Sequence, residues 1–294
     1  MKILLTGATG FIGKNIKEYF EKNHLLSDYD IKTPKRGELA LSDENATEEY
    51  LKKEKFDVVI HTANTNDFRD RLTSYDILNN NLRMFFNLER CNGCYGKMLY
   101  LGSGAEFDFE HYKPLMEEEY FGKHIPKDPY GLAKYTMNMV AQKSRNIYNL
   151  RLFGVYGRYE QWQRRFISNA ICRSIKGMPI TISQNVYFDY LYIDDFCRIL
   201  KWFTDNTPLY HSCNVCTSKP VTLKTLAEKV NEITGLNREI IISREGFKRE
   251  YSGDNKKMIQ QVGNIEFTPF HKGIKELYDY YLEIQDHIDE KQLI

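Results

Sequence analysis

The chain has 294 residues, which is long enough for one large domain or two smaller ones with buried cores. Its 41 Lys and Arg residues are balanced by 40 Asp and Glu residues, which excludes a bulk electrostatic field that would hold nucleic acid or an anionic membrane. No apolar stretch reaches the length that spans a bilayer, and the first apolar run is interrupted by Thr6 and Gly7. We therefore expect a cytoplasmic protein with no nucleic acid and no membrane among its partners.

Short apolar strands alternate with amphipathic helices over the first half of the chain. The pattern predicts, in chain order, a strand at 2–6, a helix at 11–20, a strand at 29–33, a helix at 44–53, a strand at 57–61, a helix at 74–90, a strand at 97–103, a helix around 130–134 and a strand at 149–153. Apolar strands that alternate with helices form parallel sheets covered on both faces. The expected fold class is therefore α/β, a doubly wound parallel (Rossmann) sheet.

The pattern loosens beyond Gly157, where two further helices, at 223–234 and 274–284, flank short strands. We expect a smaller C-terminal α/β lobe that binds the substrate. The expected division gives a dinucleotide-binding domain at 1–160, to which 186–212 returns, and a substrate-binding lobe made of 161–185 and 213–294. A cleft at the carboxyl ends of the strands would then lie between them.

Two C-x-x-C pairs, Cys91/Cys94 and Cys213/Cys216, have the spacing of zinc ligands. The second pair lies in a run typical of a strand, where residues three apart face opposite sides and cannot hold one ion. Reduced thiols of a cytosolic protein explain both pairs, and we expect no metal.

A glycine-rich turn, G-A-T-G-F-I-G at residues 7–13, joins the first predicted strand to the first predicted helix. Gly7 permits a tight turn, Gly10 lets the backbone approach a pyrophosphate, and Gly13 lets the helix pack closely on the sheet. The phosphates would lie at the positive end of the helix. The candidate cofactor-binding residues of this turn are Gly7, Thr9, Gly10, Phe11, Ile12 and Gly13.

The residues after the second strand indicate which dinucleotide is preferred. NAD sites usually place an acidic residue there for the ribose hydroxyls, whereas a 2′-phosphate needs a cation. This chain has Lys35 and Arg36 at that place and no acid. The pattern favours NADP(H), with NAD(H) as the alternative.

Tyr130 and Lys134 lie one helical turn apart and so share a helix face. A free phenol has a pKa of about 10, and a neighbouring ammonium lowers it by stabilising the phenolate. Ser103 ends an apolar strand and would reach the same strand-end cleft, where it could hydrogen-bond a carbonyl oxygen that Tyr130 protonates. Ser103, Tyr130 and Lys134 are the candidate catalytic residues.

The glycine turn, Ser103, Tyr130 and Lys134 occur in the order and approximate spacing of the extended short-chain dehydrogenases/reductases, which the chain resembles over nearly its whole length. Within that family the segments 36–39 and 41–43 are similar to GDP-fucose synthase-type 4-ketoreductases. The resemblance implies cofactor contacts by Leu41, Thr62, Ala63 and Asn64, together with Tyr130 and Lys134. It also implies a nucleotide-sugar substrate and a homodimer formed through the helices at 74–90 and 130–144.

The chain departs from the family pattern around the substrate. GDP-fucose synthases move protons at C3 and C5 with a cysteine and a histidine, where this chain has Ala105 and Arg165, so the resemblance implies reduction without epimerisation. Gly154 and Phe188 replace residues that hold the diphosphate. Arg173 matches a diphosphate-binding arginine, and other arginines could compensate for the missing contacts. The candidate substrate-binding residues are Ser103, Gly104, Ala105, Arg165, Arg173 and Arg249.

The predicted function is an NADPH-dependent C4 ketoreductase of a nucleoside-diphosphate 4-keto-(6-deoxy) sugar. One alternative is a nucleotide-sugar 4-epimerase with bound NAD, against which the missing acid after the second strand argues. A dehydratase is disfavoured because Gly104 and Ala105 stand where such enzymes have Asp-Glu. A second alternative is a non-catalytic dinucleotide-binding regulator, which would have little use for the retained Tyr130 and Lys134.

Overall fold

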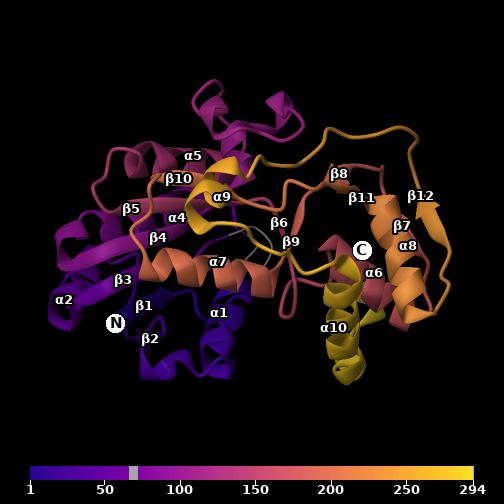
Figure 1. The fold of residues 1–294 in the computed structure, drawn as a ribbon, viewed down its shortest axis with the longest axis horizontal. Coiled ribbons are helices and arrows are strands. Elements are labelled where there is room, and N and C mark those ends of the chain that lie inside the picture. Colours follow the sequence, from indigo (N-terminus) through magenta and orange to yellow (C-terminus); the bar gives the residue numbers. More distant parts are fainter. Residues whose placement is uncertain (66–71, 294) are drawn as a thin grey trace.

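A six-stranded parallel sheet forms the centre of the protein, in the strand order β10-β5-β4-β3-β1-β2. The structure is a computed structural model that describes residues 1–65 and 72–293. The strands of this sheet are β1 (Lys2–Thr6), β2 (Asp30–Lys32), β3 (Phe56–His61), β4 (Tyr95–Ser103), β5 (Ile147–Leu152) and β10 (Ser212–Val215). This arrangement confirms the predicted doubly wound α/β fold (Figure 1).

Helices cover both faces of the sheet, as the alternating sequence pattern predicts. They are α1 (Phe11–Lys22), α2 (Glu44–Glu54), α4 (Ser74–Glu89), α5 (Pro129–Ala141) and α7 (Ile193–Asp205). Neighbouring β1 residues serve opposite faces, because Ile3 and Leu5 join a core cluster with α1 and α7 whereas Leu4 joins a second cluster with α4 and α5. Both faces of the sheet are therefore buried, and functional groups reach solvent at the strand ends.

The second part of the chain builds a smaller lobe beside the sheet, on the right of Figure 1. Its elements are β6 (Gly154–Tyr156), α6 (Phe166–Ile175), β7 (Ile180–Ile182), β8 (Tyr187–Phe188), β9 (Tyr190–Tyr192), β11 (Val221–Thr222), α8 (Leu223–Thr234), β12 (Ile240–Ile242) and α10 (Phe270–Glu283). Strands pair here only in twos, as β6-β9, β7-β12 and β8-β11. The apolar faces of α6, α8 and α10 belong to the same core cluster as one face of the main sheet, so the lobe shares a core with the sheet.

One expected boundary needs correction. The lobe was expected to resume at residue 213, but that residue lies inside β10, which pairs with β5 through Cys213↔Leu150 and Asn214↔Arg151. The following helix α9 (Lys256–Val262) also packs against β10. The chain thus returns to the main sheet twice after residue 160. The sequence does not predict the second return, because a short buried strand carries no signal for the sheet that it will join.

The strand predicted around Cys213 is confirmed, and Cys216 lies just beyond it. In the part of the chain that the structure describes, none of the helices has the length and apolarity to cross a membrane. Short 3-10 helices complete the fold at Leu25–Ser27, Asn92–Cys94, Gly104–Phe107, Phe109–His111, Glu118–Tyr120, Gln285–His287 and Glu290–Gln292.

Candidate active site

The glycine turn between β1 and α1 has the tight geometry that its sequence predicts. Gly7 has φ +70°, and a Cβ there would lie 2.6 Å from the Ala63 nitrogen at the end of β3. A Cβ on Gly13 would lie 2.3 Å from the Gly7 oxygen, which also accepts a 2.9 Å hydrogen bond from Gly10 N. No side chain caps the start of α1, and its first turn contains no acidic residue. The first amides of α1 therefore have no side-chain partner, as is typical of helix starts that bind phosphate.

The segment after β3 lies directly beside this turn. Thr62 Oγ1 donates to the Thr6 carbonyl at 2.7 Å, and Ala63 N donates to Thr6 Oγ1 at 3.3 Å. Asn64 and Thr9 are exposed, and Phe11 and Ile12 are half-buried. The structure thus places these predicted cofactor contacts along one edge of the sheet.

Lys35 and Arg36 follow β2 and are exposed, at the edge strand next to β1. A turn holds them, since Leu39 N donates to the Lys35 carbonyl at 3.0 Å and Lys35 N to Glu38 Oε2 at 2.7 Å. Leu41 is half-buried, and its carbonyl accepts from Asn87 Nδ2 at 2.8 Å. Two cations therefore lie at the carboxyl end of β2, where a dinucleotide presents its adenosine ribose in this fold.

Ser103, Tyr130 and Lys134 come together at the carboxyl end of β4. Ser103 is the last residue of β4, and α5 starts at Pro129 under the cap of Asp128, whose Oδ1 accepts from Gly131 N at 2.7 Å. The Ser103 hydroxyl is a hydrogen-bonding neighbour of the Tyr130 phenol, and Lys134 Nζ lies 5.7 Å from the centre of the Tyr130 ring. Ser103 and Lys134 are buried, whereas Tyr130 is half-buried. The predicted catalytic group is therefore assembled.

The electrostatics of the group differ from the expectation in one respect. Burial raises the pKa of Tyr130 above its ordinary value, while the hydrogen bond with Ser103 and the charge of Arg165 oppose that rise. Lys134 was expected to lower this pKa on balance, but its Nζ donates to the Leu101 carbonyl at 2.7 Å. Burial also lowers the pKa of Lys134 to about 8. On balance the pKa of the Tyr130 phenol is raised, because desolvation of the phenolate outweighs the effect of the nearby positive charges.

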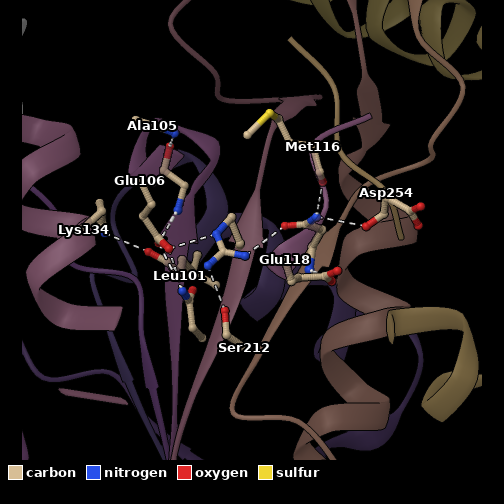
Figure 2. Close-up of polar contacts among 12 residues, drawn as sticks. Leu101, Ala105, Glu106, Met116, Glu118, Lys134, Ser212 and Asp254 are labelled. Atoms are coloured by element: carbon tan, nitrogen blue, oxygen red, sulfur yellow. Dashed lines mark hydrogen bonds and ion pairs between the residues drawn. The ribbon is translucent and has the colours of Figure 1, made fainter. Parts of the chain in front are cut away.

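A buried ion-pair network lies next to Ser103 and Lys134 (Figure 2). Glu106 and Arg151 have no exposed side-chain surface and form an ion pair, with Arg151 Nε 2.9 Å from Glu106 Oε2. Glu106 Oε1 accepts from Ser103 N at 3.1 Å and, with Oε2, from Asn149 Nδ2. Arg151 Nη1 donates to Asn214 Oδ1 at 3.0 Å. One carboxylate thus fixes the backbone of Ser103.

The network continues toward the segment that carries residues 250–254. Asn214 Nδ2 donates to the carbonyls of Met116 and Asp254 at 2.7 and 2.9 Å, and Asn214 N donates to Glu118 Oε1 at 2.8 Å. Figure 2 shows these contacts as one chain of hydrogen bonds. Sequence reasoning missed Glu106, Arg151 and Asn214 as partners because they come from three separate segments.

The expected substrate residues fall into two groups. Gly104 and Ala105 are buried directly after Ser103, and Ala105 N donates to Ser103 Oγ at 3.2 Å. Arg165 is exposed at the start of α6, and its charge lowers the pKa of Tyr130, which places it near the phenol.

The other two arginines are held elsewhere. Arg173 is buried, with Nε donating to the Pro179 carbonyl at 2.7 Å and Nη1 to the Leu293 carbonyl at 3.2 Å, so these donors support the chain fold. Arg249 is exposed and its Nη1 lies 3.4 Å from the Phe109 carbonyl. The structure therefore places Arg165 near Tyr130, whereas Arg173 donates to the Pro179 and Leu293 carbonyls.

Tyr251 is a further site residue that the sequence reasoning missed. Ser103 is a hydrogen-bonding neighbour of its hydroxyl, and its phenol also faces that of Tyr130. Its Oη lies 2.7 Å from the point where a Cβ of residue 104 would be, so only glycine fits at 104 without displacing it. The signal in the sequence was only one tyrosine among 21, which no spacing rule could have selected.

The doubly wound sheet, the glycine turn and the Ser103-Tyr130-Lys134 cluster define an enzyme of the extended short-chain dehydrogenase/reductase type. The model of the NAD dependent epimerase/dehydratase family matches residues 3–216. The chain belongs to this family, and the predicted family and enzyme class are confirmed.

Individual relatives are distant but match almost the full length. The GDP-L-colitose synthase of Yersinia pseudotuberculosis is 22% identical, over 96% of this chain and 98% of its own. The crystal structure of a GDP-L-fucose synthetase from Naegleria fowleri has a TM-score of 0.84 at 18% identity and covers 98% of this chain and 94% of its own. MlghC, a GDP-mannoheptose C4 reductase from Campylobacter jejuni with NADP bound, has a TM-score of 0.79 at 20% identity and covers 96% and 98% of the two chains.

Proposed function

We propose that this protein reduces the C4 ketone of a nucleoside-diphosphate 4-keto sugar with NADPH. The observation that carries the proposal is the assembly of Ser103, Tyr130 and Lys134 at the carboxyl end of β4, at the same edge of the sheet as the glycine turn. Relatives described as a GDP-sugar synthase and a GDP-heptose C4 reductase support a nucleotide-sugar substrate.

The residues present fit a nicotinamide dinucleotide phosphate. A Cβ at Gly7 or Gly13 would collide with backbone, and the uncapped amides of α1 suit the diphosphate. The exposed Lys35 and Arg36 suit a 2′-phosphate, for which a guanidinium can supply two parallel donors. The bound form of MlghC supports the same preference. NAD(H) is the alternative that the experiment below distinguishes.

When bound, the reduced dinucleotide supplies a hydride to the ketone carbon. Tyr130 donates its proton to the ketone oxygen, and Ser103 hydrogen-bonds the Tyr130 oxygen and stabilises the charge that develops there. Lys134 holds the nicotinamide ribose and stabilises the charge left on the phenol oxygen. Burial keeps the pKa of Tyr130 raised, so the phenol is protonated at neutral pH, as a proton donor requires.

Epimerisation at C3 or C5 is not part of the proposal. Ala105 carries no group that exchanges a proton, and Arg165 is a poor base because its guanidinium stays protonated. Arg165 instead supplies a positive charge near Tyr130, and we assign it, together with the exposed Arg249, to the substrate's phosphates. Arg173 donates to two backbone carbonyls, so we assign it to stabilising the fold and not to substrate binding.

A direct test compares 4-keto nucleotide sugars as substrates, with NADPH and NADH as separate reductants, and identifies the product by mass spectrometry and NMR. We expect NADPH oxidation only when a 4-keto sugar is present, and retention of the C3 and C5 configuration. Tightly bound NAD in the purified protein, with interconversion of 4-hydroxy sugars, would contradict the reductase. Dinucleotide binding with no turnover of any sugar would support the regulator instead.

A homodimer formed through α4 and α5 is part of the same proposal. These two helices pack against each other, and the outward residues Tyr75 on α4 and Met139 on α5 are 72% and 40% exposed. Large apolar side chains on adjacent helices suit a helix-bundle interface. Light scattering at micromolar concentration is expected to give twice the chain mass, and a monomer would contradict this assignment.

A further inference from the structure

Tyr251 is held rigidly by a segment of the second lobe. Its backbone pairs with β8 opposite Phe188, since Tyr251 N donates to the Tyr187 carbonyl and the Tyr251 carbonyl accepts from Asp189 N, both at 2.9 Å. Its ring centre lies 4.7 Å from that of Phe188 and 5.1 Å from that of Phe153. The hydroxyl position is therefore fixed by backbone pairing and by ring packing on more than one side.

The hydroxyl of Tyr251 lies against the catalytic serine. Ser103 is a hydrogen-bonding neighbour of both Tyr251 and Tyr130, and Tyr251 Oη occupies the space that the missing side chain of Gly104 leaves. Tyr251 and Tyr130 are half-buried, whereas Ser103 is buried. Two phenols from different lobes thus share one serine.

The number of hydrogen bonds that the Ser103 hydroxyl can donate and accept limits how it can contact both phenols. A serine hydroxyl has one proton to donate and two positions that accept. One accepting position is taken by Ala105 N at 3.2 Å. If Tyr251 donates to the other position, the only proton of Ser103 is free to point at the Tyr130 oxygen.

We propose that Tyr251 is a positioning residue that donates its hydroxyl proton to Ser103 Oγ and so directs a chain of hydrogen bonds from Tyr251 through Ser103 to Tyr130. The Tyr130 proton then points away from Ser103 and toward the substrate ketone. The inference rests on the proposed ketone reduction, because only a proton donor benefits from this orientation.

The proton balance of the step is simple. The Tyr130 O–H bond breaks and an O–H bond forms on the substrate oxygen, while the hydride and its electron pair form the new C–H bond. The ketone is reduced to an alcohol and the nicotinamide is oxidised. Ser103 and Tyr251 keep their protons, and the Ser103 hydroxyl donates to the negative oxygen left on Tyr130.

The first test is a double-mutant cycle on kcat with Tyr251→Phe and Ser103→Ala. Tyr251→Phe keeps the ring and its packing, and we expect kcat to fall by about 10-fold, with KM for the sugar and the dissociation constant of NADPH within about two-fold. In the Ser103→Ala background the second change should have no further effect, because Tyr251 acts through Ser103. Tyr187→Phe is the matched control, because it removes a hydroxyl from the strand that pairs with Tyr251 and should leave kcat unchanged. Multiplicative losses in the double variant, or wild-type kcat in Tyr251→Phe, would overturn the proposal.

The second test does not need turnover. With 3-fluorotyrosine incorporated at position 130, the ¹⁹F shift followed against pH reports the ionisation of that phenol alone. We expect Tyr251→Phe to raise the pKa at position 130, because Ser103 loses its direction toward the phenolate, and Tyr187→Phe to leave it unchanged. An unchanged pKa in Tyr251→Phe overturns the hydrogen-bond chain even if the enzyme reduces sugars. A raised pKa without sugar reduction would support the chain and refute the proposed function.

Discussion

The doubly wound half and the smaller second lobe place functional groups in different ways. In the doubly wound half, the turn at 7–13 and the segment at 62–64 directly follow strands of one parallel sheet and Ser103 ends another, so they meet at one edge. In the lobe, strands pair only in twos, and Tyr251 reaches the site by pairing with Tyr187 and Asp189. In a regular parallel sheet, local sequence patterns predict which residues meet at the site. In a lobe assembled from distant segments, local patterns do not predict this.

The largest effect is expected in the doubly wound half, where local sequence patterns predict the site residues. Tyr130→Phe should lower kcat by about 10³-fold, because it removes the proton donor, while NADPH affinity changes by less than about two-fold. Steady-state kinetics and fluorescence titration of NADPH measure the two quantities.

Tyr135→Phe is the control for this change, since it removes a hydroxyl from the same helix where its ring packs on Phe121. A Tyr130→Phe enzyme with near wild-type kcat would show that another group protonates the ketone.

The next effect concerns the junction of the two regions. Glu106→Ala should lower the free energy of unfolding by about 3–5 kcal/mol, because it leaves the Arg151 guanidinium buried without its partner. Urea denaturation followed by circular dichroism measures the change.

Glu110→Ala is the matched control, because Glu110 pairs with Lys127 on the surface, where the ion pair is exposed to solvent. No measurable change is expected there. Equal stabilities for the two variants would mean that the buried pair does not support the catalytic strand end.

A smaller effect concerns the choice of cofactor. Arg36→Ala should lower kcat/KM for NADPH by about 10- to 100-fold, because a charge-assisted hydrogen bond to the 2′-phosphate is lost. The value for NADH should hardly change. Lys53→Ala removes an exposed cation from α2 and should affect neither dinucleotide. Equal losses with NADPH and NADH would place Arg36 away from the 2′-phosphate.

The smallest effect is a pH dependence of stability. The pKa of Lys134 is about 8 in the folded protein because of burial, whereas an exposed lysine has a pKa of about 10.4. Between these values the unfolded chain binds the proton and the folded chain does not, so the contribution of Lys134 to the free energy of unfolding rises with pH. The expected gain is about 1–2 kcal/mol from pH 8 to pH 9.5.

Comparison with Lys134→Met isolates this contribution. His61 and Glu106 face the ammonium, and Lys97 also has a pKa lowered to about 8, but all three remain in the variant. Denaturant midpoints of wild type and variant should diverge as pH rises through this range. Parallel curves would show that Lys134 keeps its proton in the fold.

The sequence by itself determined the sheet, the glycine turn and the Ser103-Tyr130-Lys134 cluster. Each depends on local features, namely strand and helix periodicity and the residues that directly follow a strand, and parallel strands bring such residues together regardless of the rest of the chain. The expected elements of the first half agree with the observed ones to within a few residues.

Only the tertiary structure decided the membership of β10 in the main sheet, the Glu106-Arg151 pair, the buried role of Arg173 and the position of Tyr251. It also decided the upward direction of the Tyr130 pKa. All of these depend on which distant segments pack together and how much water they exclude. Pairing between distant segments and desolvation arise only once the chain has folded, and no local pattern encodes them.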